Sequence, residues 1–136
     1  MEVSQATEFV REHHRGVLAT YRRDGTVQMS PVVAAVDPAG RVVVSTRERA
    51  IKTANLRRDP RAALVAFTDR FFGPWAMFWG TAEVITLPEA LPLLEDYYRL
   101  VAGEHPDWDE YRRAMAQEQR VLVRLLITEA GPRKSG

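Results

Sequence analysis

The chain has 136 residues and a mass of 15.4 kDa, which is enough for one domain and leaves no room for a second hydrophobic core. Its 19 basic residues nearly balance 18 acidic ones, which argues against a general nucleic-acid-binding protein, and the absence of cysteine excludes disulfides and thiolate chemistry. No apolar run approaches the roughly 18 residues of a membrane span, so we expect a cytoplasmic protein with no membrane partner. A single domain is expected over residues 1–130, followed by a flexible tail over residues 131–136.

Six short stretches rich in β-branched and aromatic residues are separated by turn residues, and each predicts a β-strand. The expected strands cover residues 17–21, 26–36, 41–46, 62–67, 76–85 and 121–127. The spacing of apolar residues and the capping residues predict four helices. The expected helices cover residues 4–13, 47–58, 86–102 and 107–118. Strands joined mainly by hairpin-sized turns, with helices at the periphery, predict a mainly β chain that forms a small six-stranded antiparallel barrel.

Particular residues mark the ends of these elements. Asp-Gly at residues 24–25 supplies the positive φ that a tight hairpin turn requires. Pro31 would remove a hydrogen-bond donor from the middle of its strand, so this strand should lie at an edge or carry a bulge. Thr-Leu-Pro-Glu at residues 86–89 fits a capping box that starts a helix, and Gly103 is placed to end that helix. Residues 107–110 form a second box-like helix start.

The titratable residues form no evident catalytic constellation. His13 and His14 are adjacent at a helix end, where their side chains point in different directions, and His105 precedes a proline in a turn. A solvated helix end explains the first two, and the titration of histidine near neutral pH keeps a functional role open. The carboxylates fall at helix starts or on solvated faces. We therefore expect no catalytic side chain and no metal site.

Residues 47–61 are strongly basic in a chain whose charge is otherwise balanced. The segment holds two acidic residues against six basic ones, namely Arg47, Arg49, Lys52, Arg57, Arg58 and Arg61. It follows the hydroxyl groups of Ser45 and Thr46 and opens a helix whose first amides attract anions. The pattern indicates a phosphate site, with a solvated basic helix as the alternative, and the three arginines beyond the first turn favour that alternative. Lys52 is the one lysine of the predicted domain, because Lys134 lies in the tail.

Aromatic residues gather just before and within the fifth predicted strand. They are Phe71, Phe72, Trp75, Phe78 and Trp79. Because Phe78 and Trp79 are neighbours on a strand, one of them must face away from the core of its own subunit. An outward-facing ring favours a subunit interface or the wall of a ligand site over core packing.

Four runs of sequence occur in a familiar order and spacing. They are Gly-Val-Leu-Ala-Thr at 16–20 with Asp-Gly at 24–25 and Gln-Met-Ser at 28–30; Lys-Thr-Ala-Asn-Leu-Arg-Arg-Asp-Pro-Arg-Ala at 52–62; Gly-Thr-Ala at 80–82; and Tyr-Arg-Leu-Val-Ala-Gly-Glu-His-Pro-Asp-Trp at 98–108 with Glu-Tyr-Arg at 110–112 and Arg-Val-Leu at 120–122. Together they resemble the pyridoxamine 5′-phosphate oxidase-like split-barrel family. The last run is similar to the actinobacterial subgroup that uses the deazaflavin coenzyme F420.

The resemblance implies a six-stranded split β-barrel that forms a homodimer, with a cofactor in a groove between the subunits. The residues implied on the phosphate side are Ser45, Thr46, Arg49, Ala50, Ile51 and Lys52. Those implied beside the cofactor ring are Gln28, Met29, Ser30, Pro31 and Val32. Those implied to close the groove from the partner chain are Trp75, Met77 and Trp79. Two positions depart from the family pattern: Ala50 stands where many members have arginine, and Pro31 where many have a polar residue.

The activity implied by the resemblance is that of an oxidoreductase, a reductase that uses coenzyme F420 to transfer a hydride to a planar unsaturated small molecule. FMN in the same groove, in an oxidoreductase related to pyridoxamine 5′-phosphate oxidase, is the first alternative. A dimer that binds a cofactor or haem without catalysis is the second. The residues do not specify the substrate, because its selection would depend on the shape of the groove.

Overall fold

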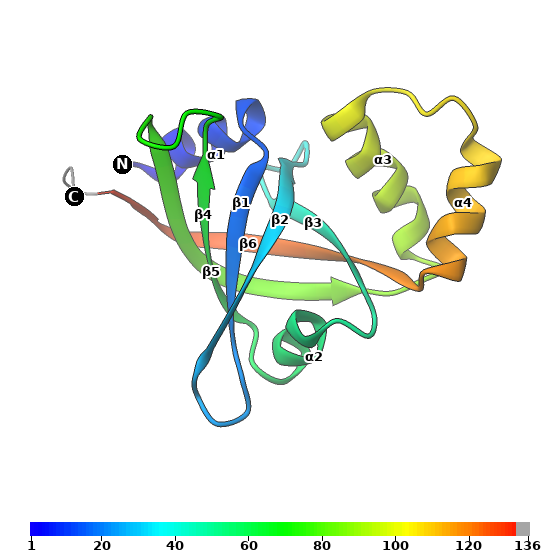
Figure 1. Cartoon of the computed structure of the whole chain (residues 1–136), viewed down its shortest axis with the longest axis horizontal. Coiled ribbons are helices and arrows are strands. Elements are labelled where there is room, and N and C mark those ends of the chain that lie inside the picture. The colour runs from blue at the N-terminus through cyan, green and yellow to red at the C-terminus, as the bar shows by residue number, and fades with distance from the viewer. Residues whose placement is uncertain (133–136) are drawn as a thin grey trace.

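The computed structural model describes residues 1–132, which form a closed six-stranded antiparallel β-barrel with four helices around it (Figure 1). The strands are β1 (Arg15–Tyr21), β2 (Val27–Val36), β3 (Val42–Arg47), β4 (Arg61–Phe67), β5 (Trp75–Ile85) and β6 (Arg120–Gly131). The helices are α1 (Val3–Glu12), α2 (Ile51–Arg58), α3 (Ala90–Ala102) and α4 (Trp108–Gln117). The order around the barrel is β1-β2-β3-β6-β5-β4, which confirms the predicted fold class.

The final strand is longer than expected. We predicted that it would end at residue 127, but it continues to Gly131, which pairs with Met77 on β5. The first two residues of the expected tail are therefore described with the barrel, and residues 133–136 lie outside the described part of the chain. No helix of residues 1–132 is long and apolar enough to cross a bilayer.

Alternation along the strands builds the core. In β1, β4 and β5 every second residue points inward, and the largest fully buried side chains there include Leu64 and Phe78. Phe78 is 0% exposed and its neighbour Trp79 is 38% exposed, so the outward-facing ring of this pair belongs to Trp79.

Pro31 lies at a free edge, as predicted. β2 pairs with β1 along its whole first part, where Pro31 faces Val17. Its pairing with β3 is limited to the three residues from Ala34 to Val36. Pro31 lies outside that short ladder. The N–H that proline lacks would therefore have had no partner on β3, and the strand tolerates proline at this position. The same free edge leaves an opening between β2 and β3.

Two of the expected helix starts are wrong. α2 begins at Ile51 rather than residue 47, because Arg47 still pairs with Arg120 as the last residue of β3 and residues 48–50 form a turn. α3 begins at Ala90 rather than residue 86, because residues 87–89 form turns closed by a bond from the Ala90 N–H to the carbonyl of Thr86. Its first turn has no side-chain cap, so the expected capping box is absent.

The other two helix signals are confirmed. Gly103 ends α3 with a φ of 79°, and its N–H bonds to the carbonyl of Arg99. The Asp107 side chain accepts a hydrogen bond from the N–H of Glu110 at the start of α4.

α3 and α4 pack on the outside of the barrel and build a second, smaller core (Figure 1). Ala90 and Leu94 on α3 are fully buried and join a cluster with Ala35 of β2 and Val43 of β3. This packing places the later turns of α3 beside the point where β2 and β3 separate.

Candidate functional site

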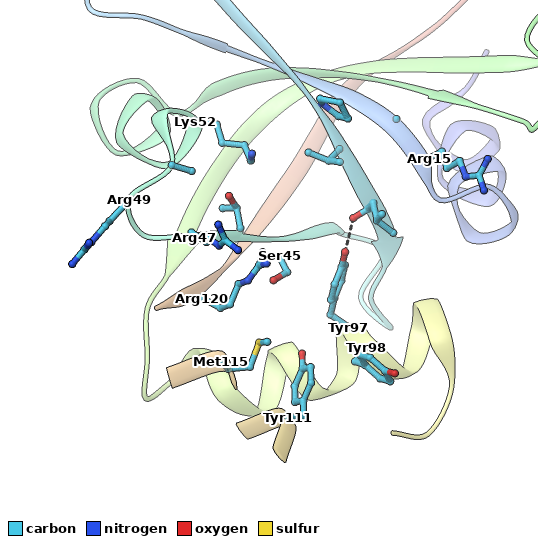
Figure 2. Close-up of a pocket in the computed structure, with 16 residues that line it drawn as sticks. Arg15, Ser45, Arg47, Arg49, Lys52, Tyr97, Tyr98, Tyr111, Met115 and Arg120 are labelled. Carbon is cyan, nitrogen blue, oxygen red and sulfur yellow. Dashed lines mark hydrogen bonds between the residues drawn. The ribbon is translucent and has the colours of Figure 1, made fainter. Parts of the chain in front are cut away.

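A cavity of about 1000 Å³ opens where β2 and β3 separate, between the barrel and the α3–α4 pair (Figure 2). One wall is polar and cationic and comes from β3, β6 and the start of α2. The opposite wall is aromatic and comes from Tyr97, Tyr98, Tyr111 and Met115 of the two helices. The free edge of β2, residues 31–33, lies between these walls.

Lys52 projects from the first turn of α2 toward the cavity (Figure 2). Burial lowers the pKa of its ammonium group, and the positive charge of Arg120 lowers it further. No carboxylate of residues 1–132 forms an ion pair with Lys52. A partly buried cation that faces another cation and lacks a counter-ion is suited to binding an anion from solution.

Free hydroxyl groups line the same cavity as this ammonium group. Ser45 and Thr46 end β3 and line the cavity, and neither hydroxyl hydrogen-bonds to any residue that the structure describes. Thr46 is only 3% exposed and pairs with Val121 of β6, so its backbone is fixed within the barrel. α2 begins a few residues later, and its first amides bring the partial positive charge of a helix start to the same wall.

The arginines of the site differ in how far their charge is neutralised. Arg120 is the most enclosed, and it shares the carboxylate of Glu118 with Arg47. Arg15 is exposed and pairs with Asp69, so its charge is partly neutralised at the rim. Arg49 has no ion-pair partner among the described residues, but its side chain extends away from the cavity (Figure 2).

The remaining arginines of the predicted basic segment bond to groups outside the cavity. Arg57 pairs with Glu48 and Arg61 with Asp59, and Arg58 donates to the carbonyl of Tyr21. These contacts agree with the expectation that the arginines beyond the first turn belong to a solvated face of the helix.

Two of the three cavity tyrosines use their hydroxyl groups in hydrogen bonds to backbone carbonyls. Tyr111 donates to the carbonyl of Leu94 and Tyr97 to the carbonyl of Val33, each at 2.7 Å. Burial raises the pKa of Tyr111 to about 12 and also raises the pKa of Tyr97. Both phenols are therefore neutral near pH 7, and they act as fixed ring surfaces rather than as acids. Tyr98 makes ring contacts with Tyr111 and Trp108.

The cavity brings together half of the predicted site residues. Those that line it are Pro31, Val32, Ser45, Thr46, Arg49, Ala50 and Lys52. Those that do not line it are Gln28, Met29, Ser30, Ile51, Trp75, Met77 and Trp79. The last three lie on β5, whose odd-numbered residues face out of the barrel, where a partner chain is needed to bring them to a cavity.

Nine lining residues lie outside the set that the resemblance implied. They are Arg15, Gly16, Val33, Arg47, Tyr97, Tyr98, Tyr111, Met115 and Arg120. Tyr98, Tyr111 and Arg120 fall within the run at 98–122 that carries the resemblance, and this run was the available signal for them. Arg47 belongs to the basic segment at residues 47–61 that indicated a phosphate site, and the others reach the site only through tertiary packing.

The sequence matches the pyridoxamine 5′-phosphate oxidase family over residues 3–132. The chain belongs to this family. The fold is also that of several solved structures. One is the conserved hypothetical protein Rv2991 from Mycobacterium tuberculosis, with a TM-score of 0.76 and 26% identity over 100% of this chain and 92% of that one. Another is an F420 reductase, with a TM-score of 0.67 and 22% identity over 91% of this chain and 94% of that one. A third is an FAD-binding protein from Mesorhizobium loti, with a TM-score of 0.66 and 16% identity over 96% of this chain and 92% of that one.

The identities to the F420 reductase and to the FAD-binding protein, 22% and 16%, establish the shared fold alone. The choice between cofactors rests on this chain's own residues.

Proposed function

We propose that the protein is a reductase that uses coenzyme F420 to transfer a hydride to a planar unsaturated small molecule. The observation that carries the proposal is the uncompensated Lys52 ammonium group, which faces the same cavity as the free hydroxyls of Ser45 and Thr46. These groups suit a phosphate, and the additional cations Arg47 and Arg120 suit further anionic groups on one ligand.

The residues of the free edge of β2 fit the polar part of a deazaflavin ring. Ser30 Oγ is buried and has no hydrogen-bond partner among the described residues. A buried hydroxyl without a partner is costly, and a ligand that bonds to it would remove that cost. Ser30 does not itself line the cavity, but Val32, two residues further on the same face of β2, does, and Ser30 belongs to the part of β2 that has no pairing with β3.

When bound, coenzyme F420 supplies the hydride, and the chain's own task is to bind, orient and exclude water. Lys52, Ser45 and Thr46 neutralise and orient the phosphate. The backbone of β2 at residues 31–33 holds the polar edge of the ring. The ring faces of Tyr98 and Tyr111 exclude water from the side opposite the cationic wall.

Calorimetric titration of the purified protein with coenzyme F420 and, separately, with FMN tests the proposal. We expect the tighter binding for coenzyme F420, because its anionic tail adds partners for the arginines, and we expect oxidation of the reduced coenzyme by a panel of planar acceptors. Tighter FMN binding, with a yellow protein on purification, would assign the flavin alternative instead. Tight coenzyme binding without turnover of any acceptor would indicate a binding protein.

We propose further that two copies of the chain assemble through the outer face of β2, β1, β4 and β5. The strand register sets outward side chains side by side there: Met29 pairs with Ala19, Ala63 with Trp79, and Val65 with Met77. Met29 is 66% and Trp79 38% exposed in the single chain. A continuous apolar sheet face of this kind is typical of a subunit interface, and a homodimer would bring the partner's Trp75, Met77 and Trp79 to the groove.

Trp79→Glu should convert the protein from a dimer to a monomer of 15.4 kDa, because an unpaired carboxylate would be buried at the centre of the proposed interface. Multi-angle light scattering during gel filtration measures the mass. Leu100→Glu is the matched control, since Leu100 is similarly exposed, at 42%, but lies on α3. A wild-type protein that is monomeric at tens of micromolar, or equal behaviour of the two variants, contradicts the proposed dimer.

A further inference from the structure

The opening between β2 and β3 begins one residue beyond their last pair. Ala34 pairs with Val44, and the same register continued by one residue would pair Val33 with Ser45. The N–H of Ala34 donates to the carbonyl of His14, on the β1 side. Because neighbouring residues of a strand direct their backbone groups to opposite sides, the carbonyl of Val33 is directed toward β3. Val33 and Ser45 would therefore form a hydrogen-bonded pair, yet the ladder stops before them.

The hydroxyl of Tyr97 occupies the position of that missing pair. It donates to the carbonyl of Val33 at 2.7 Å, as the dashed line in Figure 2 marks. The backbone N–H of Ser45 lies on the same side and lowers the pKa of this phenol, which opposes the larger effect of burial. One side-chain hydroxyl thus takes the Val33 carbonyl that the next step of the β2–β3 ladder would have joined to the N–H of Ser45.

The packing of α3 fixes Tyr97 in this place. Ala90 and Leu94, seven and three residues earlier on the same face of the helix, are both fully buried in the cluster that contains Ala35 and Val43. α3 is therefore anchored on the paired part of β2 and β3, and its next turn brings the tyrosine to the point where the pairing ends. The ring is held on one side by the helix and on the other by the two strands.

We propose that Tyr97 is a positioning residue that holds β2 and β3 apart and so keeps the cavity open for the anionic ligand. Direct pairing of Val33 with Ser45 would draw the free edge of β2 toward the hydroxyl-bearing end of β3, and a ligand would have to break that pair before binding. The inference rests on the proposed function for the identity of the ligand, but the separation of the strands is a property of the free protein.

Hydrogen exchange of the Ser45 amide, measured by NMR on the ligand-free protein, tests the inference in Tyr97→Phe and Tyr97→Ala. We expect exchange at Ser45 to slow by about three- to tenfold, the factor that one net hydrogen bond represents. Affinity for coenzyme F420, measured by titration, should fall by a similar factor, because the ligand must reopen the new pair. Tyr21→Phe, which removes a phenol hydroxyl from the end of β1, outside the cavity and without a bond to a described residue, should change neither quantity.

The direction of the change at Ser45 separates this role from a merely structural one. Loss of a structural contact would speed exchange, so faster or unchanged exchange at Ser45 in both Tyr97 variants would overturn the inference. Slower exchange with unchanged coenzyme affinity would overturn it as well, since the opening would then be irrelevant to the ligand. A wild-type protein that binds no coenzyme F420 would refute the proposed function, and the exchange experiment would still decide whether Tyr97 separates the strands.

Discussion

Lys52→Met should weaken the binding of coenzyme F420 by about 1–3 kcal/mol, or roughly fivefold to 150-fold, which is the range for losing a charge-assisted contact. Methionine keeps an unbranched apolar side chain and removes the charge together with the N–H donors. The loss should be large because Lys52 is the cavity cation that is both directed inward and free of a carboxylate among residues 1–132. Calorimetric titration of both proteins under identical salt conditions measures the difference.

The same substitution should leave the free protein equally or more stable. Burial and the charge of Arg120 lower the pKa of Lys52 in the folded state, so the unfolded chain binds this proton more readily. The charged lysine therefore destabilises the fold at neutral pH, and this penalty disappears as the pH rises from the lowered folded-state pKa toward the ordinary value. Lys52→Met should remove that pH dependence from the melting temperature.

Arg57→Met is the matched control for both measurements. Arg57 lies on the same helix, but it is paired with Glu48 on the solvated face. It should retain wild-type affinity for the coenzyme. Equal losses of affinity in the two variants would show a general electrostatic effect and would contradict a specific site at Lys52.

Gly80→Ala should lower the free energy of unfolding by about 3 kcal/mol, near the upper end of ordinary single substitutions. A Cβ atom at Gly80 would meet the backbone carbonyl oxygen of Leu126 on the neighbouring strand. The register of β5 and β6 shifts between Trp79 and Gly80, and the two backbones approach closely at this irregularity. Because the obstructing atom belongs to the backbone, the strands must separate to make room. Urea unfolding monitored by tryptophan fluorescence measures the change.

Gly25→Ala separates this clash from the general cost of replacing a glycine. Gly25 has a φ of 87° and no atom within 4 Å of the added Cβ, so only the backbone conformation opposes alanine there. The expected loss is about 1–2 kcal/mol. Losses of the same size at both positions would contradict the close approach of β5 and β6.

The barrel was predictable because its signals are local. Turn residues such as Asp24 and Gly25 and the alternation along each strand fix where strands begin and which side chains point inward, and the outward position of Trp79 followed from the same alternation. The Asp107 cap was also predictable, since a cap involves residues three apart. The expectation that α3 begins at Thr86 was wrong. The carbonyl of Thr86 accepts a hydrogen bond from the N–H of Ala90 and closes a turn over residues 87–89, and the helix begins only after this turn.

The candidate site was only partly predictable, because one of its walls depends on tertiary packing. The cationic wall follows β3 directly in sequence, so Ser45, Thr46 and Lys52 were found from a short segment. The aromatic wall comes from helices more than 40 residues later, and Tyr97 reaches β2 only because α3 packs on the paired part of two strands. No spacing in the sequence encodes that contact.

A crystal structure of the protein with coenzyme F420 tests the central claim most directly. The predicted result places the coenzyme phosphate within about 3 Å of Lys52 Nζ, the distance of a charge-assisted hydrogen bond, and beside the Ser45 hydroxyl, with the deazaflavin ring along the free edge of β2. A coenzyme bound elsewhere on the molecule, or a bound coenzyme with Lys52 directed into solvent, would contradict the account.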